Sequence, residues 1–429
     1  MIFVAGTANV ELCLENRAKM IAIEATKLGH RATRPFLYWF AAGHFANDFG
    51  PAGLWILAPA IAASMNLSPA EIGLLITILQ AGAAMAYLPA GLLGDHVSNN
   101  GRLLLFTFVW VAIGYSVSSL APNFWTVVLL LTLAGLGDAA WHPLATGVLV
   151  RLRPDRRAEA LGIHAVGGSL AEVFSPLAMG FLIGIVGWRD SMLIAALPAA
   201  VMALAFVWVS QRLPRMDQRR FSHTDFKAVV LHWCKPTGLK LVAIISSYNM
   251  ALMAILAMIP VYFQQRHGFS IWQTGVAFSS MILLGALVQP FLGRLSDRLG
   301  RRRVILFGNA FAAALAVSAG VLGVNLVITI ASLSIATMTL TGIRSVLLAA
   351  AVDYSADREG TALGLAFSLL FGIGALGAWF GGLSANVMLE GGFLAAAGFS
   401  LIATVVCALT KFETNSVPES IREPDKPRN

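Results

Sequence analysis

Charged residues are scarce in this chain of 429 residues. Asp, Glu, Lys and Arg make up only 12% of it, whereas soluble globular domains average about 25%. Hydrophobic residues make up 57%, and the mean hydropathy is +0.75. So little polar surface cannot cover the apolar remainder, which lipid must solvate instead. The composition excludes a soluble globular protein and predicts an all-α integral membrane protein.

Cysteine is rare in the sequence, and several familiar catalytic motifs are absent from it. The three cysteines, Cys13, Cys234 and Cys407, fall on segments that indicate no disulfide framework. The sequence holds no phosphate-binding G-x-x-x-x-G-K-[ST] loop, no H-E-x-x-H, no C-x-x-C and no G-x-S-x-G. We therefore expect no ATP hydrolysis, no cofactor, no metal and no enzymatic activity.

Long apolar stretches are what the chain has instead, and twelve of them are long enough to cross a bilayer. They lie at about 37–64, 71–94, 103–121, 124–150, 158–186, 190–212, 240–265, 271–296, 303–323, 324–352, 360–386 and 391–411. An even number of spans places both termini on one side of the membrane.

Basic residues are distributed very unevenly over the connecting segments. All of the 30 Lys and Arg residues except Arg189, Arg266 and Arg344 fall on the side of the termini. Cationic loops resist translocation, so this side is expected to be cytoplasmic. The net charge of +8 then needs no nucleic-acid partner. We expect a multi-pass protein of the inner membrane that acts as a monomer.

The spans and charges divide the chain into five parts. These are a cytoplasmic tail (1–36), a six-helix bundle (37–212), a cytoplasmic linker (213–239), a second six-helix bundle (240–411) and a polar, disordered tail (412–429). Within the linker, Asp225 to Trp233 forms one amphipathic stretch, which we expect to lie at the lipid headgroups.

Two landmarks recur with one spacing. Gly91-Leu-Leu-Gly-Asp95 follows the second span, and Gly293-Arg-Leu-Ser-Asp297 follows the eighth, 202 positions later. The stretch that starts at Asp155 is matched by another that starts at Asp357, again 202 positions later. Two independent landmarks with one offset indicate an internal duplication. Repeats of six spans share one orientation and relate by an axis along the membrane normal, with substrate sites between them.

The loop pattern G-x-L-x-D-(R)-x-G-R resembles the signature of the major facilitator superfamily. Two further segments are similar to fosmidomycin-resistance-type efflux proteins within it: Gly135 to Pro143, and Val166 to Gly168 with Ser175-Pro176. His44-x-x-Asn47-Asp48 resembles that group too. The resemblance implies the major facilitator fold, with twelve helices in two six-helix repeats. It also implies that the first, fourth, seventh and tenth spans line a central cavity.

Few ionisable residues lie deep within the spans, and they form two layers. At about 1.5 Å of rise per residue, the basic layer lies roughly 9–12 Å below the cytoplasmic ends and the acidic layer roughly 16–21 Å. The basic layer consists of His44, His142, His164 and Arg344, and the acidic layer of Asp48, Asp138 and Glu172. Such residues usually face a cavity or a partner, because each costs about 2.5–3.5 kcal/mol to insert. The offset also places Arg344 at the position equivalent to His142.

These residues, with Asn47, form the predicted substrate and proton pathway. A carboxylate in a low-dielectric cavity is suited to load and release a proton, and the three histidines are suited to relay it. Arg344 stays charged and is expected to hold an anionic or polar substrate by a bidentate contact. The alternative is that the same residues pair only to hold helices together. It remains open for all of them, above all for His44, His164 and Glu172.

The two signature loops are predicted to form a cytoplasmic gate. A carboxylate at the end of one helix gains energy by docking on the N-terminus of a helix in the other half. The predicted gate consists of Gly91, Asp95, Arg102, Gly293, Asp297, Arg298, Gly300 and Arg301. The simpler interpretation, that the basic residues only enforce topology, does not exclude such a latch.

Taken together, the sequence predicts a secondary active transporter that exports a small organic, anionic or drug-like compound by proton coupling and alternating access. A proton symporter that takes up a metabolite is the alternative. A receptor or a membrane-embedded enzyme on the same fold is less consistent with the short linker and tails. The substrate, the direction, the proton stoichiometry and the true start codon do not follow from the sequence.

Overall fold

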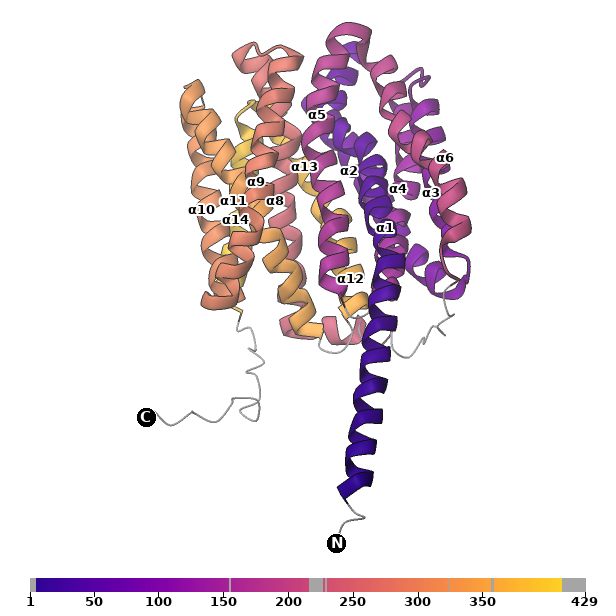
Figure 1. Cartoon of the computed structure of the whole chain (residues 1–429). Helices are drawn as coiled ribbons and strands as arrows, with labels where there is room; N and C mark the ends of the chain where they lie inside the picture. The colour runs from indigo at the N-terminus through magenta and orange to yellow at the C-terminus, as the bar shows by residue number, and fades with distance from the viewer. Residues whose placement is uncertain are drawn as a thin grey trace.

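Helices make up all of the regular structure in the computed structural model of the chain, which describes residues 5–153, 156–215, 227, 230–323, 325–355 and 359–410. Outside these residues lie four of the nine positions of the amphipathic stretch from Asp225 to Trp233, the polar tail from 412 onward, and both Asp155 and Asp357. The helices form two groups that stand side by side (Figure 1).

The first half consists of six helices. They are α1 (Ala5–Met65), α2 (Pro69–His96), α3 (Asn100–Ser118), α4 (Phe124–Leu152), α5 (Arg157–Ala195) and α6 (Leu197–Arg212). α1 is helical well before the predicted first span, so the segment predicted as a tail continues the helix. α5 contains a break at Gly187, whose φ of 76° and ψ of 172° are not helical. The break separates the fifth crossing from the sixth, as hydropathy predicts.

The second half has the same order. It consists of α8 (Pro236–His267), α9 (Ile271–Leu299), α10 (Arg301–Leu322), α11 (Leu326–Ser355), α12 (Glu359–Phe371), η1 (Ile373–Ala375), α13 (Leu376–Val387) and α14 (Gly391–Ala408). Ten stretches of the described residues are apolar and long enough to span a membrane. The one from Glu159 to Arg212 holds two crossings, and α1 adds another, which gives the twelve that the sequence predicts.

The eleventh span is broken, which the sequence analysis missed. It consists of α12, one 3-10 turn and α13, and the break begins at Gly372 with φ −85° and ψ −87°. A break inside a membrane leaves backbone carbonyl groups without helical partners. The side chain of Asn249 on α8 supplies one partner, because its Nδ2 donates to the Leu370 oxygen at 2.6 Å.

Helix caps confirm the duplication independently. Ser68 and Glu71 form a capping box at the start of α2, and Ser270 and Gln273 form one at the start of α9, 202 positions later. Such boxes satisfy two of the backbone N–H groups that a helix start leaves free. Because the offset recurs at cap positions as well as in the loops, the halves share element boundaries.

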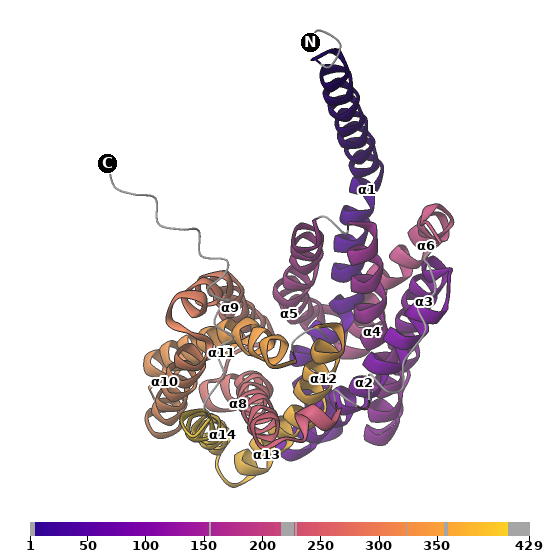
Figure 2. The same ribbon diagram turned by 90° about the horizontal axis from the view of Figure 1, so that it is seen from below.

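Both α1 and α14 have their chain ends on the same face of the bundle, which we name the termini face (Figure 1). Figure 2 views the bundle from this side and shows the two halves facing each other. The halves meet most extensively through two pairs of helices, α2 with α13 and α5 with α9.

The α2–α13 contact depends on glycine. A Cβ atom on Gly73 would lie 2.2 Å from the carbonyl oxygen of Ala378, and one on Gly382 would lie 2.3 Å from that of Pro69. Both distances are far below van der Waals contact, so no other residue fits without moving backbone. Small residues allow this close approach of helices in lipid.

The α5–α9 contact also depends on glycine, at the equivalent positions of the opposite halves. A Cβ atom on Gly275 would lie 2.8 Å from the oxygen of Pro176, and one on Gly180 would lie 3.0 Å from that of Ile271. Each of these four residues is offset by 202 positions from its counterpart in the first contact. The two seams are therefore related by the pseudo-twofold axis.

The α2–α13 seam is the tighter of the two and carries additional hydrogen bonds. Thr77 Oγ1 donates to the Ala375 oxygen at 2.8 Å and accepts from the Trp379 N–H at 3.2 Å. Ala70 N–H donates to Asn386 Oδ1 at 3.1 Å. Both seams lie towards the face opposite the termini, where they hold the two halves together.

We predict that Gly73→Ala opens the α2–α13 seam. Its Cβ must move from 2.2 Å to at least the 3.4 Å of an ordinary contact with the Ala378 oxygen, and backbone atoms cannot yield locally. Spin labels at Leu120→Cys and Val387→Cys report on the two halves at the face opposite the termini, where both positions are exposed. Double electron–electron resonance should show longer distances in the variant.

Gly398→Ala is the matched control, because a Cβ there would meet nothing within 4 Å. Labelling requires a background in which the native cysteines are replaced by serine. A distance distribution that Gly73→Ala leaves unchanged, like that of the control, would contradict the role of this seam.

Candidate functional site

α1 carries three polar side chains into the interior of the first half. His44, Asn47 and Asp48 lie just before Pro51, within the long helix. His44 Nε2 lies 3.2 Å from Asp48 Oδ2, so the i,i+4 spacing brings the two together on one face. Asp48 Oδ1 also faces α4, where His142 Nε2 lies 3.7 Å away.

Asn47 links the two predicted aspartates. Its side chain is fully buried, and its Nδ2 donates to Asp138 Oδ1 at 2.5 Å and to Asp48 Oδ1 at 3.1 Å. One amide thereby holds two carboxylates on different helices. The sequence placed all three residues in one pathway, and the structure places them in direct contact.

Two histidines stack between α1 and α5. The rings of His44 and His164 are 4.1 Å apart and nearly parallel. His44 Nδ1 lies 2.8 Å from the His164 carbonyl oxygen, and His164 Nδ1 lies 3.2 Å from the Phe40 carbonyl oxygen. Because a carbonyl oxygen only accepts, both Nδ1 atoms are assigned as donors. Gly168 makes room for this stack, since a Cβ there would lie 2.6 Å from His44 Nε2.

We name the set of His44, Asn47, Asp48, Asp138, His142 and His164 the α1–α4–α5 cluster. Its ligand-type atoms converge at one point: His44 Nε2, an Asp48 oxygen and His142 Nε2 all lie within 4.8 Å of one another. Within the described chain this is the one group of side chains spaced to hold a metal ion.

The remaining two predicted pathway residues join the two halves. Arg344 Nη1 on α11 lies 3.7 Å from Glu172 Oε1 on α5. The Glu172 side chain is 44% exposed and that of Arg344 is 22% exposed. The Tyr248 hydroxyl donates to the Leu340 oxygen at 2.6 Å, and its oxygen accepts a hydrogen bond from Arg344. Tyr248 thus orients the guanidinium, a role that nothing in the sequence analysis indicated.

An aromatic contact between the halves was also missed. Tyr87 on α2 stacks against Phe371 and Phe367 on α12, with ring centroids 5.7 and 6.0 Å apart. Its ring also lies 6.0 Å from that of His142. Aromatic residues in apolar spans usually indicate only packing, so a sequence signal for this contact was lacking.

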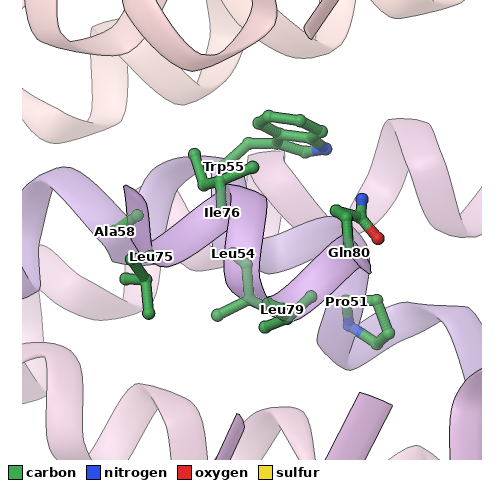
Figure 3. Close-up of a pocket in the computed structure, with 8 residues that line it drawn as sticks. All are labelled: Pro51, Leu54, Trp55, Ala58, Leu75, Ile76, Leu79 and Gln80. Carbon is green, nitrogen blue, oxygen red and sulfur yellow. The ribbon is translucent and has the colours of Figure 1, made fainter. Parts of the chain in front are cut away.

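A narrow apolar pocket lies beside the α1–α4–α5 cluster, between α1 and α2 (Figure 3). Trp55 and Ala58 line it from α1, and Leu75 and Ile76 line it from α2. Gln80 is its only polar lining residue, and Figure 3 shows its amide next to Pro51. The pocket extends the polar cluster towards the face opposite the termini.

The first signature loop pairs within its own half. Asp95 Oδ1 accepts from Arg151 Nη2 of α4 at 3.3 Å. Gly91 packs opposite Pro143, to which a Cβ would lie 3.6 Å away. Arg102 is exposed, and its N–H is capped by Asn99.

The second signature loop also pairs within its own half, but its acidic and basic residues stand at different positions. Arg301 pairs with Asp297 and, at 3.4 Å, with Asp353 of α11. Asp353 follows Arg151 by the same 202 positions, so an acidic residue stands where the first half has a basic one. Gly300 ends α9 with a φ of 90°, which only glycine adopts readily, while Gly293 packs near Ser345 and Arg298 is exposed. The latch across the halves stays a prediction, because in this conformation each aspartate bonds within its own half.

We predict that Asn47→Ala destabilises the first half. Removal of the amide leaves Asp48 and Asp138 without a shared donor in a buried site, and such a loss costs about 1–3 kcal/mol. Thermal unfolding of the purified chain in detergent should show a clearly lower Tm. Asn309→Ala is the control, because Asn309 is equally buried but donates only to Ile305 of its own helix. An equal loss of Tm in both variants would show that Asn47 has no special role.

Known proteins match the chain in sequence along much of its length. A sequence model of the Major Facilitator Superfamily matches residues 40–378 and 273–428. A Haemophilus influenzae protein whose name assigns it metabolite transport is 24% identical over 274 residues, 61% of this chain and 67% of that protein. A Helicobacter pylori protein named as a sugar efflux transporter is 32% identical over 191 residues, 43% of this chain. That match spans 46% of the Helicobacter protein, less than half its length.

Solved structures share the fold. A bacterial homologue of the human lysosomal transporter Spinster, crystallised in an inward-facing conformation, superposes with a TM-score of 0.73 at 16% identity, covering 88% of this chain and 96% of the other. The nucleoside transporter NupG superposes with a TM-score of 0.71 at 15% identity, covering 87% and 98%. These comparisons confirm the predicted fold and bear out the resemblance at the level of the superfamily. The chain belongs to the Major Facilitator Superfamily and is a multi-pass membrane transporter of small molecules, not an enzyme.

Proposed function

We propose that the chain is a proton-coupled exporter of a small organic anion, with Arg344 as the anion-binding group. The ion pair between Arg344 and Glu172 is the observation that carries the anion-binding part of this proposal. It joins the two halves within the membrane, where the superfamily's architecture places substrates. A cation at such depth is expensive and usually serves a substrate or ion pathway.

A substrate anion would replace Glu172 as the partner of Arg344. The guanidinium is already oriented by Tyr248, so its remaining N–H groups are positioned for a bidentate contact with a carboxylate or phosphonate. Glu172 is half-exposed and therefore accessible to a small molecule. Exchange of partners would loosen a link between the halves and so couple binding to their relative movement.

Glu172 is also the group to which we assign the proton. Protonation removes its negative charge and with it the attraction for Arg344, leaving the guanidinium free. Anion binding is then favoured when Glu172 carries a proton and opposed when its carboxylate competes for Arg344. Protonation of Glu172 and binding of the anion to Arg344 thus favour each other.

Export is the direction we propose, because a relative matched over part of the chain is named as a sugar efflux transporter. The resemblance of Gly135 to Pro143 to fosmidomycin-resistance-type efflux proteins supports the same direction. Exchange with protons requires that proton and substrate exclude each other at some group. Asp138 suits this role, since a substrate hydroxyl that donates to its carboxylate would compete with a proton.

Uptake by symport is the second candidate, and the sign of the Arg344–Glu172 coupling favours it. A proton on Glu172 promotes anion binding, so both would travel in the same direction at this pair. The two candidates therefore differ in which carboxylate carries the coupled proton. It is Glu172 for symport and Asp138 for export.

We further propose that the termini face is cytoplasmic and that the membrane is the bacterial inner membrane. The support is the concentration of Lys and Arg on the connections at this face. The predicted monomer belongs to the same proposal, as do protons as coupling ions.

Growth in the presence of fosmidomycin, a phosphonate, tests the export proposal. Cells that lack the protein should be more sensitive than cells that produce it. Arg344→Gln should behave like the deletion, because loss of charge-assisted hydrogen bonds worth about 1.5–3 kcal/mol lowers affinity roughly 10- to 100-fold. Arg212→Gln is the control, since Arg212 is exposed and contacts only Trp208 of its own helix. Protection that Arg344→Gln retains in full would refute the anion site.

Proteoliposomes with an imposed pH gradient distinguish the two directions. Fosmidomycin driven along the proton gradient indicates symport, and fosmidomycin driven against it indicates exchange. In either case we predict that Glu172→Gln binds the anion tightly at every pH, whereas the wild type binds more weakly as pH rises. Glu159→Gln, at the exposed start of α5, should follow the wild type. Parallel pH profiles for the wild type and Glu172→Gln would remove Glu172 from the proton step.

A further inference from the structure

Three members of the α1–α4–α5 cluster have a geometry that the proposed transport of an organic anion does not use. We propose that His44, Asp48 and His142 form a binding site for a divalent transition-metal ion with the ligand preference of Zn²⁺. The site lies in the first half alone, apart from the Arg344–Glu172 pair. It would revise the expectation of no metal that the sequence supports.

The spacing of the three donor atoms fits one ion. Around Zn²⁺, bonds of about 2.0–2.1 Å in a tetrahedron place neighbouring ligand atoms about 3.3 Å apart. His44 Nε2 and Asp48 Oδ2 are 3.2 Å apart, and His142 Nε2 and Asp48 Oδ1 are 3.7 Å apart. All three donors lie within 4.8 Å of one another, so a small rotation of the rings completes the arrangement.

The donor atom of His44 is held in the form that binds metal. Its Nδ1–H donates to the His164 carbonyl oxygen, which leaves the lone pair on Nε2 pointing at the Asp48 carboxylate. A histidine that binds metal through one nitrogen characteristically donates from the other to a carbonyl or carboxylate. Two acceptors face each other at Nε2 and Oδ2, and a positive charge between them is needed to make this contact favourable.

A proton alone does not satisfy the whole group. One proton bridges His44 and Asp48, but His142 then stays 3.7 Å from the same carboxylate, beyond hydrogen-bond distance. Among the described hydrogen bonds, none involves the ring of His142. A metal ion accepts electron pairs from all three donors at once, which accounts for a second histidine at this point.

Charge and chemistry narrow the class of ion. Two imidazoles and one carboxylate suit Zn²⁺, Co²⁺ or Ni²⁺, whereas Mg²⁺ and Ca²⁺ prefer oxygen ligands. Asp48 supplies the carboxylate ligand, and Asn47 joins it to the carboxyl group of Asp138 in the apolar interior. A divalent cation would be stabilised by this acidic pair.

His164 is a positioning residue for this site. Its carbonyl orients His44, its ring stacks on His44 at 4.1 Å, and it is only 3% exposed. Its Nε2 is buried without a hydrogen-bond partner.

Titration of the tag-free, full-length protein in detergent with Zn²⁺ tests the proposal. Calorimetry should show one ion bound per chain. His142→Ala should weaken binding at least tenfold, and because the ring of His142 makes no described hydrogen bond and its backbone bond to Thr146 is retained, the variant is expected to fold. His44→Ala and Asp48→Asn should do the same. His96→Ala is the control, since this histidine is exposed at the end of α2 and bonds only to Leu92.

Co²⁺ gives a second, spectroscopic readout. The wild type should show the visible absorption of a low-coordinate Co²⁺ site, and His142→Ala should lose it. His142→Cys retains a donor at this position and should restore binding with a new sulfur-to-cobalt charge-transfer band. Zn²⁺ binding that survives all three substitutions, no binding by the wild type, or no such band in His142→Cys would each overturn the site. Because none of these measurements involves transport, the result is independent of the proposed exporter.

Discussion

A bilayer interior offers no hydrogen bonds, and every polar group in the spans of this protein must therefore find its partner within the protein. This constraint is visible at several buried polar side chains that bridge two helices. Asn47 serves two carboxylates, Asn249 serves a carbonyl freed by the break in the eleventh span, and Tyr248 serves both a carbonyl and Arg344. Each of these side chains fixes one helix against another while it removes an unsatisfied group. The transport apparatus and the scaffold are built from the same contacts.

The two halves share a backbone arrangement but differ in their buried ionisable side chains. Caps, glycine seams and signature loops recur at an offset of 202 positions, so the backbone arrangement is duplicated. The buried ionisable groups are not: histidines and aspartates dominate the first half, and Arg344 stands where the first half has His142. At the termini face, Arg151 in one half corresponds to Asp353 in the other. We propose that this divergence at equivalent positions lets the first half bind a cation and the second half an anion on a common frame.

Much of this organisation follows from the sequence, and the reasons are local. Hydropathy gives the spans because a helix needs about 20 apolar residues to cross, and the duplication follows from two short loops. The glycine seams were within reach as well, because Gly73 and Gly275, like Gly180 and Gly382, obey the same offset. The side-chain pairs between different helices could not be predicted from the sequence. That Asp95 meets Arg151, or that His142 approaches Asp48, depends on which helices are neighbours and how they are rotated. Likewise, the break at Gly372 is stabilised by Asn249 on another helix, so residues 360–386 alone predict one continuous span.

The broken eleventh span gives the protein a joint inside a single crossing. α13 is held to α2 by the glycine seam and the Thr77 hydrogen bonds, whereas α12 meets α2 through the aromatic contacts of Tyr87. Stacked rings slide and separate more easily than interlocked backbones, and the 3-10 turn between the segments allows them to bend independently. The first segment, α12, is therefore held to the first half less tightly than α13 is. We expect separation of Tyr87 from Phe367 and Phe371 to loosen the contact between the halves towards the termini face, while the glycine seam towards the opposite face is retained.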